Sequence, residues 1–233
     1  MSAPRPQSEV VSLRGADALS YLDTQCTQDL TSLDVNGRAT TLLLAPSGEI
    51  VTIATVHRVL PDLLLLEVPA GTGDATVARL ERFAIRADVA FSAHEAPVEA
   101  PRGWFADALA RIAAGVPGAA ELARGLVPHG IGEELRARCV SLTKGCYPGQ
   151  EIVARMQARD ATPPYVLRRC TLDGPERPDD PVGDPDKDGR LTSVAIDPDT
   201  ERCRALCVLH RRDAAGEAAE VRTASGSVVA RFE

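Results

Sequence analysis

The stretch of eight residues from Lys144 to Glu151, KGCYPGQE, constrains the local fold more than any other part of the sequence. Its middle residues, Tyr147-Pro148-Gly149-Gln150, are typical of a type II turn, because proline presets φ at the second position and glycine supplies a positive φ at the third. An alternative is that Pro148 is the first residue of a helix, where its missing N–H costs nothing. Both interpretations place a short helix directly after this stretch.

The residues that follow have the pattern of a short amphipathic helix. Ile152, Val153 and Met156 fall on one face of such a helix. Glu151 and Arg155 stand one turn apart with the carboxylate first, which is the favoured order for a helical ion pair. We therefore expect Glu151 to pair with Arg155 and to hold the preceding loop.

Cys146 is the candidate catalytic residue of this stretch, and Lys144 is the candidate group that activates it. A thiol just outside a helix N-terminus and two residues from an ammonium group is expected to have a depressed pKa, which favours a reactive thiolate. The alternative is a structural turn whose cysteine is small and buried, since a cysteine without a disulfide often behaves as a small hydrophobic residue. The lysine and the Gln-Glu pair favour the functional interpretation, because a buried filler needs neither.

K-G-C-Y-x-G-Q-E followed by an apolar pair, Ala and Arg resembles the signature of the YgfZ-type folate-binding proteins. That family is implicated in iron–sulfur cluster assembly and repair, and it is related to the aminomethyltransferase, or T-protein, of glycine cleavage. The resemblance implies that tetrahydrofolate or a derivative is the cofactor, and that iron–sulfur assembly proteins or their client enzymes are partners. It also implies a folate site formed in part by residues around the cysteine: Tyr147, Gly149, Gln150, Glu151 and Arg155.

Two further segments resemble elements of the same family. Residues 25–30 are similar to its early Q-x-T-x-D-[LV] element, which implies that Gln28 and Asp29 lie beside the ligand cavity. A polar helix end, at which Asp29 caps nearby backbone, is the alternative. Residues 109–117 resemble the family's L-R-I-x-x-G-x-P element, and Arg111 is the cation that we expect to face a folate carboxylate. A surface helix arginine needs no such role, so this alternative also stays open.

The overall composition restricts the class of partner. The chain has 233 residues and a formal net charge of −7, which argues against binding of duplex nucleic acid, because no excess of cations is present to displace phosphate counterions. The first residues lack the apolar core of a secretory signal, and no run approaches the roughly 18 apolar residues of a membrane span. We therefore expect a cytoplasmic protein with no membrane association and with reduced thiols.

The sequence predicts no metal site. The cysteines stand at positions 26, 139, 146, 170, 203 and 207, without the C-x-x-C pairs of a zinc site. The run from Asp184 to Gly189 matches the opening of a calcium-binding loop, but the twelfth position is Ala195, where a bidentate glutamate is required.

Hydrophobic patterning predicts an α+β fold. Two expected strands, Arg38 to Ala45 and Glu49 to His57, are joined by Pro46-Ser47-Gly48, a hairpin signal. Helices are expected at residues 17–26, from residue 74 and at residues 104–114, and further strands at residues 10–13, 63–68 and 85–91. Helices inserted among antiparallel strands suggest a sheet with helices on one face. The family resemblance implies a split ferredoxin-like arrangement.

Two domains are expected, with a boundary between Asp160 and Pro164. Residues 1–160 form the folate-binding, aminomethyltransferase-like domain, and residues 161–233 resemble the small C-terminal antiparallel β-barrel domain of the family. Family members usually carry a further long segment between the strand ending near Phe91 and the helix at Trp104. Residues 92–103 span this gap, so we expect an abridged first domain.

Three functions are candidates. The predicted one is a tetrahydrofolate-binding accessory factor for iron–sulfur cluster assembly or repair that uses Cys146 as a thiolate, and that is an assembly factor more than a conventional enzyme. The second is a folate-dependent one-carbon transferase like the T-protein, and the Lys-Gly-Cys-Tyr sequence argues against it because that enzyme lacks the cysteine loop. The third is an interaction module without a ligand.

Overall fold

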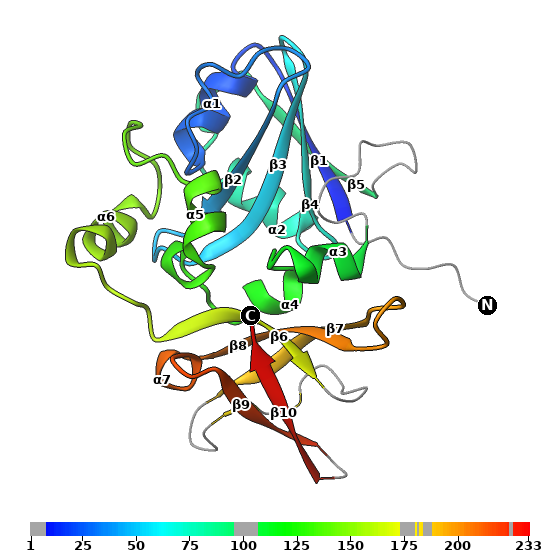
Figure 1. The fold of residues 1–233 in the computed structure, drawn as a ribbon. Helices are drawn as coiled ribbons and strands as arrows, with labels where there is room; N and C mark the ends of the chain where they lie inside the picture. The colour runs from blue at the N-terminus through cyan, green and yellow to red at the C-terminus, as the bar shows by residue number, and fades with distance from the viewer. Residues whose placement is uncertain (1–7, 96–106, 173–179, 181, 184–187, 224–225) are drawn as a thin grey trace.

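A computed structural model describes residues 8–95, 107–172, 180, 182–183, 188–223 and 226–233. The chain folds into two five-stranded antiparallel sheets with most of its helices around and between them (Figure 1). The run from residue 184 to 187, the opening of the calcium-like sequence, and the start of the expected helix at residue 104 lie outside the described residues.

The first sheet has the strand order β2-β3-β4-β1-β5. Its strands are, in chain order, β1 (Ser8–Arg14), β2 (Arg38–Leu44), β3 (Ile50–Leu60), β4 (Leu63–Pro69) and β5 (Ala90–Glu95). The expected β2–β3 hairpin is present, and its turn is closed by a hydrogen bond from Gly48 N to the Ala45 carbonyl at 2.9 Å. Gly48 has φ +88°, a conformation that favours glycine.

Two details of this half differ from expectation. The element order contains one strand more than a βαββαβ ferredoxin-like unit, and β1 is antiparallel to both of its neighbours, so the split ferredoxin-like arrangement is not confirmed. The strand expected at residues 85–91 begins only at Ala90. The segment before it is held as a loop because Asp88 N donates to the Asp17 carboxylate and the Asp88 carbonyl accepts from Asp17 N.

The two faces of the first sheet bury different cores. On one face, α1 (Ala18–Gln25) and α2 (Gly73–Glu81) cover Leu43 and Val56. Because side chains alternate along a strand, Leu42 and Ile53 face the opposite side. There they pack under α3 (Ala108–Ala113), α4 (Ala119–Leu122), η1 (Pro128–Gly130) and α5 (Glu133–Cys139). The expectation of helices on one face is therefore wrong, since helices contact both.

The second sheet has the order β7-β8-β6-β10-β9. It contains β6 (Tyr165–Leu172), β7 (Arg190–Ile196), β8 (Cys203–His210), β9 (Ala218–Thr223) and β10 (Gly226–Phe232), and α7 (Arg211–Ala214) follows β8. The expected closed barrel is not formed, because the edge strands β7 and β9 do not pair with each other over the described residues. Instead, backbone at Val182 and Gly183 reaches both edges, with bonds from Val182 N to Gly189 O and from Gly183 N to Glu220 O.

A single core joins the two halves of the chain. Leu206 and Val208 of β8 and Leu167 of β6 belong to the same buried cluster as Leu42 and Ile53 of the first sheet. The expected boundary near residue 160 falls between the end of α6 (Gln150–Arg159) and the start of β6. No helix in the described part of the chain is both long and apolar enough to cross a membrane.

Candidate thiol site and interdomain pocket

The loop from Lys144 to Glu151, which we call the Cys loop, contains the expected type II turn. Gln150 N donates to the Tyr147 carbonyl at 3.2 Å, and Gly149 adopts φ +83° and ψ −1°, the values that this turn requires at its third position. The α6 helix then begins at Gln150. The alternative of a helix beginning at Pro148 is therefore wrong.

The turn is pressed against the β2–β3 hairpin. A Cβ atom on Gly149 would lie 2.6 Å from the Ala45 carbonyl oxygen and 2.9 Å from Leu44 Cβ. On the other side of this contact, Gly48 faces Ile152 of α6 equally closely. Glycine at both positions therefore allows the Cys loop to rest on the hairpin.

Lys144 is buried beneath the Cys loop, with 3% of its side chain exposed. Its Nζ donates to the Asp23 carbonyl at 2.6 Å and to the Gln28 carbonyl at 2.7 Å, and it lies 3.2 Å from the Asp23 carboxylate. The Asp23 carbonyl is one of the last four of α1, which lack helical partners. Lys144 thus caps α1 and ties the loop to it, and its ammonium group is engaged with these oxygens.

Cys146 is exposed, whereas the side chains of Lys144, two residues before it, and Tyr147, directly after it, are buried. All six cysteines lie in the described part of the chain, and Cys146 alone is exposed. Tyr147 is 7% exposed and belongs to the central core, and burial, followed by the nearby Cys26, raises its pKa to about 12. Gly145 has open space where a side chain would be. The loop therefore buries Lys144 and Tyr147 and presents the thiol of Cys146 to solvent.

The predicted residues of α6 lie at its exposed start. Glu151 and Arg155 form the expected i,i+4 ion pair, with 82% and 51% of their side chains exposed. The carboxamide of Gln150 faces back into the turn, and its Oε1 accepts from Tyr147 N at 3.4 Å.

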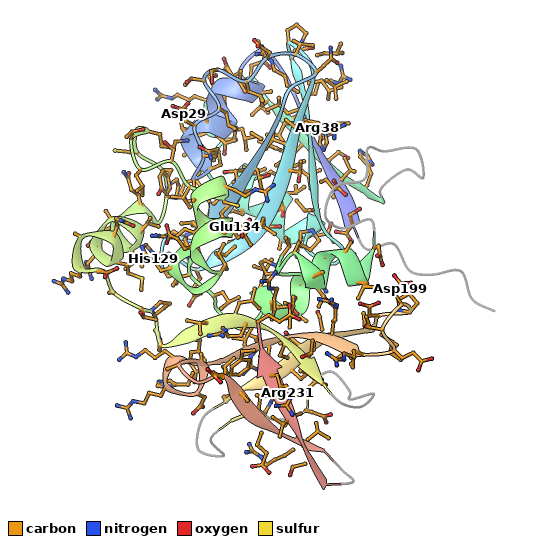
Figure 2. All side chains as sticks on the ribbon, in the orientation of Figure 1. Asp29, Arg38, His129, Glu134, Asp199 and Arg231 are labelled. Carbon is orange, nitrogen blue, oxygen red and sulfur yellow. The ribbon has the colours of Figure 1, made fainter. Side chains whose placement is uncertain are left out.

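Gln28 and Asp29 follow α1, and both are engaged in hydrogen bonds within the protein; Figure 2 labels Asp29. Gln28 Nε2 donates to the Arg138 carbonyl at 2.9 Å, and its Oε1 accepts from Asp29 N. The Asp29 carboxylate accepts from the backbone N–H and hydroxyl of Thr31, and these bonds lower its pKa. The bond from Thr31 N to Asp29 is of the backbone-capping kind that the sequence left open as an alternative for Asp29.

Arg111 lies inside the interface between the two halves. Its guanidinium donates to the Val116 carbonyl at 2.9 Å and to Ser193 Oγ at 2.7 Å, and it lies 3.3 Å from the Glu121 carboxylate. Glu121 is fully buried and also accepts from Ser193 Oγ at 2.5 Å. Arg111 was expected either at the surface or facing a folate carboxylate. In the structure it instead belongs to this buried ion pair.

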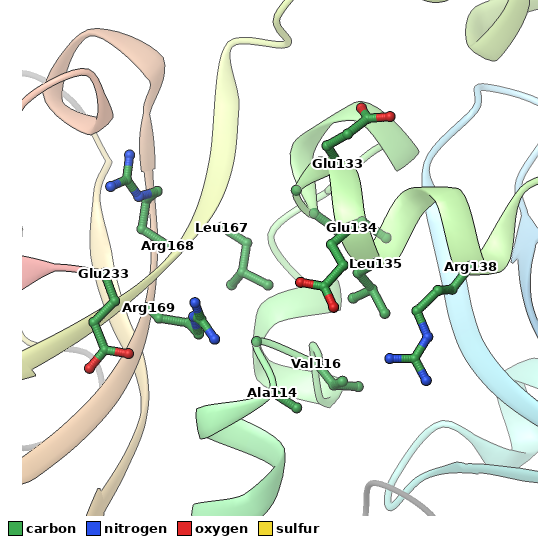
Figure 3. Close-up of a pocket in the computed structure, with 13 residues that line it drawn as sticks. Ala114, Val116, Glu133, Glu134, Leu135, Arg138, Leu167, Arg168, Arg169 and Glu233 are labelled. Atoms are coloured by element: carbon green, nitrogen blue, oxygen red, sulfur yellow. The ribbon is translucent and has the colours of Figure 1, made fainter.

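A pocket of about 260 Å³ lies between the two halves, and the sequence did not predict it (Figure 3). We call it the α5–β6 pocket, because α5 and β6 supply most of its wall. The charged ends of Glu134, Arg138 and Arg169 extend toward it, and Val116, Leu135 and Leu167 add apolar surface. None of residues 144–151 is among its lining residues. The one indication of this pocket in the sequence is the charged segment GEELRAR, residues 132–138, at the start of a helix.

The described residues contain no group of three or more His, Cys, Asp or Glu side chains arranged to hold a metal ion. The buried thiols are unsuited to ligation from solvent. Burial raises the pKa of Cys139 to about 12 and also raises that of Cys26, so both are protonated at neutral pH.

Comparisons with known proteins establish the class of fold. The crystal structure of glycine cleavage system aminomethyltransferase T from Bartonella henselae superposes with a TM-score of 0.66 over 98% of this chain and 83% of that chain, at 15% sequence identity. The chain therefore has an aminomethyltransferase T-like fold.

Sequence comparison gives less information about the class of protein. No protein-family model matches the chain. An uncharacterized protein of Haemophilus influenzae strain Rd is 24% identical over 190 residues, which cover 66% of this chain and 68% of that protein.

Proposed function

We propose that this protein is a tetrahydrofolate-binding accessory factor for iron–sulfur cluster assembly or repair, with Cys146 as its functional thiol. The observation that carries the proposal is the exposure of Cys146 between two buried anchors, Lys144 and Tyr147. A cysteine that only fills space in the core is expected to be buried, as the other five cysteines are.

The chemistry open to Cys146 is that of an accessible sulfur. As a thiolate it can bind a soft metal transiently or exchange with another protein's thiol. The N–H groups at the start of α6 lie a few residues away and favour negative charge nearby. Lys144 serves this site by holding the loop, since its ammonium group is bonded to Asp23 and Gln28.

The α5–β6 pocket has suitable groups for part of a folate. A pterin presents adjacent N–H donors that match a carboxylate such as that of Glu134, which lines this pocket. The fold likeness to an aminomethyltransferase supports a folate at the level of the fold. When bound, the folate would supply one-carbon chemistry, and the residues of the chain would orient it.

Titration calorimetry with tetrahydrofolate tests whether the protein binds this ligand. We expect saturable binding that is weakened roughly tenfold or more by Glu134→Gln, because a charge-assisted hydrogen bond to the ligand is lost. Glu151→Gln is the matched control, since Glu151 lies outside the pocket. No binding by the wild-type protein would refute the folate assignment, and equal binding by both variants would refute this pocket as its site.

The fold also supports a second candidate, a folate-dependent one-carbon transferase. Incubation with tetrahydrofolate and an amine donor distinguishes the two. Formation of methylene-tetrahydrofolate at a catalytic rate selects the transferase, and its absence together with folate binding selects the accessory factor.

A further inference from the structure

A second pocket, of about 410 Å³, adjoins the α5–β6 pocket and shares Gly132, Leu167 and Arg168 with it. Residues from both halves of the chain line it: His129 and Gly130 of η1, Val166 of β6, and Arg211 and Ala214 of α7. We call it the Arg211 pocket. Its volume is in the range of small-molecule sites, which often lie between domains.

The charged side chains that line the Arg211 pocket are cations. Arg168 and Arg211 contribute guanidinium groups, and no carboxylate side chain is among the described lining residues. The nearest acidic residue of α7, Asp213, is directed elsewhere, because a Cβ atom on Gly183 would lie 2.8 Å from its carboxylate. Glu133, on α5, pairs with Arg136. The charged side chains that line the described wall of this pocket are therefore both positive.

His129 does not provide a counter-charge. Its Nε2 lies 2.6 Å from Arg136 Nη1, and because a guanidinium only donates, this nitrogen must accept and the ring is neutral. Burial and the neighbouring Arg136 lower the pKa of His129, which keeps the ring neutral at physiological pH. Figure 2 shows His129 on the α5 side of the boundary between the halves.

Both arginines donate to backbone carbonyls. Arg168 Nη1 donates to Ala214 O at 2.6 Å, and its guanidinium carbon lies 4.8 Å from the centre of the Phe232 ring. Arg211 Nη1 donates to Thr162 O at 2.9 Å. Each anchoring bond uses one of the five N–H groups of a guanidinium. Arg168 is the more restricted of the two, because Arg211 is exposed to solvent, and restricting a side chain before binding lowers the entropy that a ligand must overcome.

We propose that the Arg211 pocket binds a small organic anion with an apolar body, such as an aromatic carboxylate. Arg168 and Arg211 hold the acidic group through charge-assisted hydrogen bonds, and Val166, Leu167 and Ala214 contact the apolar body. The inference does not depend on the proposed function, because it uses neither Cys146 nor Glu134.

The test uses 2-naphthoate and its neutral counterpart 2-naphthamide, followed by NMR of the backbone amides. Gly130 reports on the Arg211 pocket and Gly115 on the α5–β6 pocket, since each glycine lines only one of them. We expect naphthoate to shift the Gly130 resonance saturably, and naphthamide to bind roughly tenfold more weakly or worse.

Arg211→Gln is expected to weaken the binding of naphthoate and leave that of naphthamide nearly unchanged, because one of the two guanidinium groups is lost, and Arg155→Gln on exposed α6 is the matched control. Arg168→Gln provides a second variant if the first unfolds. Equal affinities for the two ligands, an unaltered naphthoate affinity in Arg211→Gln, or the absence of a Gly130 shift at millimolar naphthoate would each overturn the proposal.

Discussion

Cys146 owes its exposure to the residues beside it. The two anchors of the Cys loop are buried for different reasons: Lys144 supplies donors to carbonyls at the end of α1, and Tyr147 supplies an aromatic ring to the central core. With Gly145 between them and open space around it, the chain leaves the thiol at the surface. The position of the sulfur is therefore set by long-range contacts of its neighbours.

Alkylation with iodoacetamide under native conditions should modify one cysteine of six. The thiols at positions 26, 139, 170, 203 and 207 are buried, and the raised pKa values of Cys26, Cys139 and Cys207 keep these three protonated at pH 8. Intact-protein mass spectrometry should show a single adduct, which is lost in Cys146→Ser. A second adduct formed at a similar rate would contradict this account.

The sequence predicted the local chemistry of this loop better than its contacts. The type II turn was predictable because proline and glycine act on their own backbone. The partners of Lys144 were not, because they lie more than a hundred residues earlier in the chain. Proximity in sequence suggested Cys146 as its partner, whereas the fold brings the ammonium group to the end of α1.

At the scale of elements, the Cys loop and the β2–β3 hairpin form one packed unit. Gly149→Ala is expected to lower the free energy of unfolding by roughly 1–3 kcal/mol, because the residue has φ +83° and its new Cβ would meet the Ala45 carbonyl at 2.6 Å. Gly145→Ala, where nothing lies within 4 Å of the added atom, is the matched control. Urea unfolding followed by circular dichroism measures both, and equal losses of stability would contradict the packing described.

The hairpin and α6 were predictable from turn residues and periodicity, whereas the start of β5 was not. Residues 85–91 alternate in polarity as a strand does, yet Ile85 is 86% exposed. Bonds from Asp17 to the backbone of Asp88 hold the segment out of the sheet. Local alternation carries no information about such a contact.

At the scale of the whole molecule, the two halves are joined by one shared core and by Ser193, which bonds to the buried Arg111–Glu121 ion pair of the first half. Glu121→Gln should lower the free energy of unfolding by about 3–5 kcal/mol, because it leaves the buried Arg111 guanidinium without its counter-charge. Glu151→Gln, which breaks the exposed pair with Arg155, should leave the stability nearly unchanged. Chemical denaturation of both variants checks this, and a similar small effect of both changes would contradict a stabilising role for the buried pair.

The division into two parts was predictable from the sequence, but the way the two parts pack together was not. Strand patterning predicted a strand-rich second half, and the structure has an open five-stranded sheet instead of a closed barrel. Glu134 of the first half and Arg169 of the second half both line the α5–β6 pocket. No motif connects these two positions, so only the fold shows that they line the same pocket.

The most direct test of the central claim is the activity of iron–sulfur enzymes in cells that lack the endogenous factor. We expect wild-type protein to restore this activity and Cys146→Ser, folded and expressed at the same level, to fail, because serine keeps the shape of the side chain and removes the sulfur. Full restoration by Cys146→Ser would contradict the account.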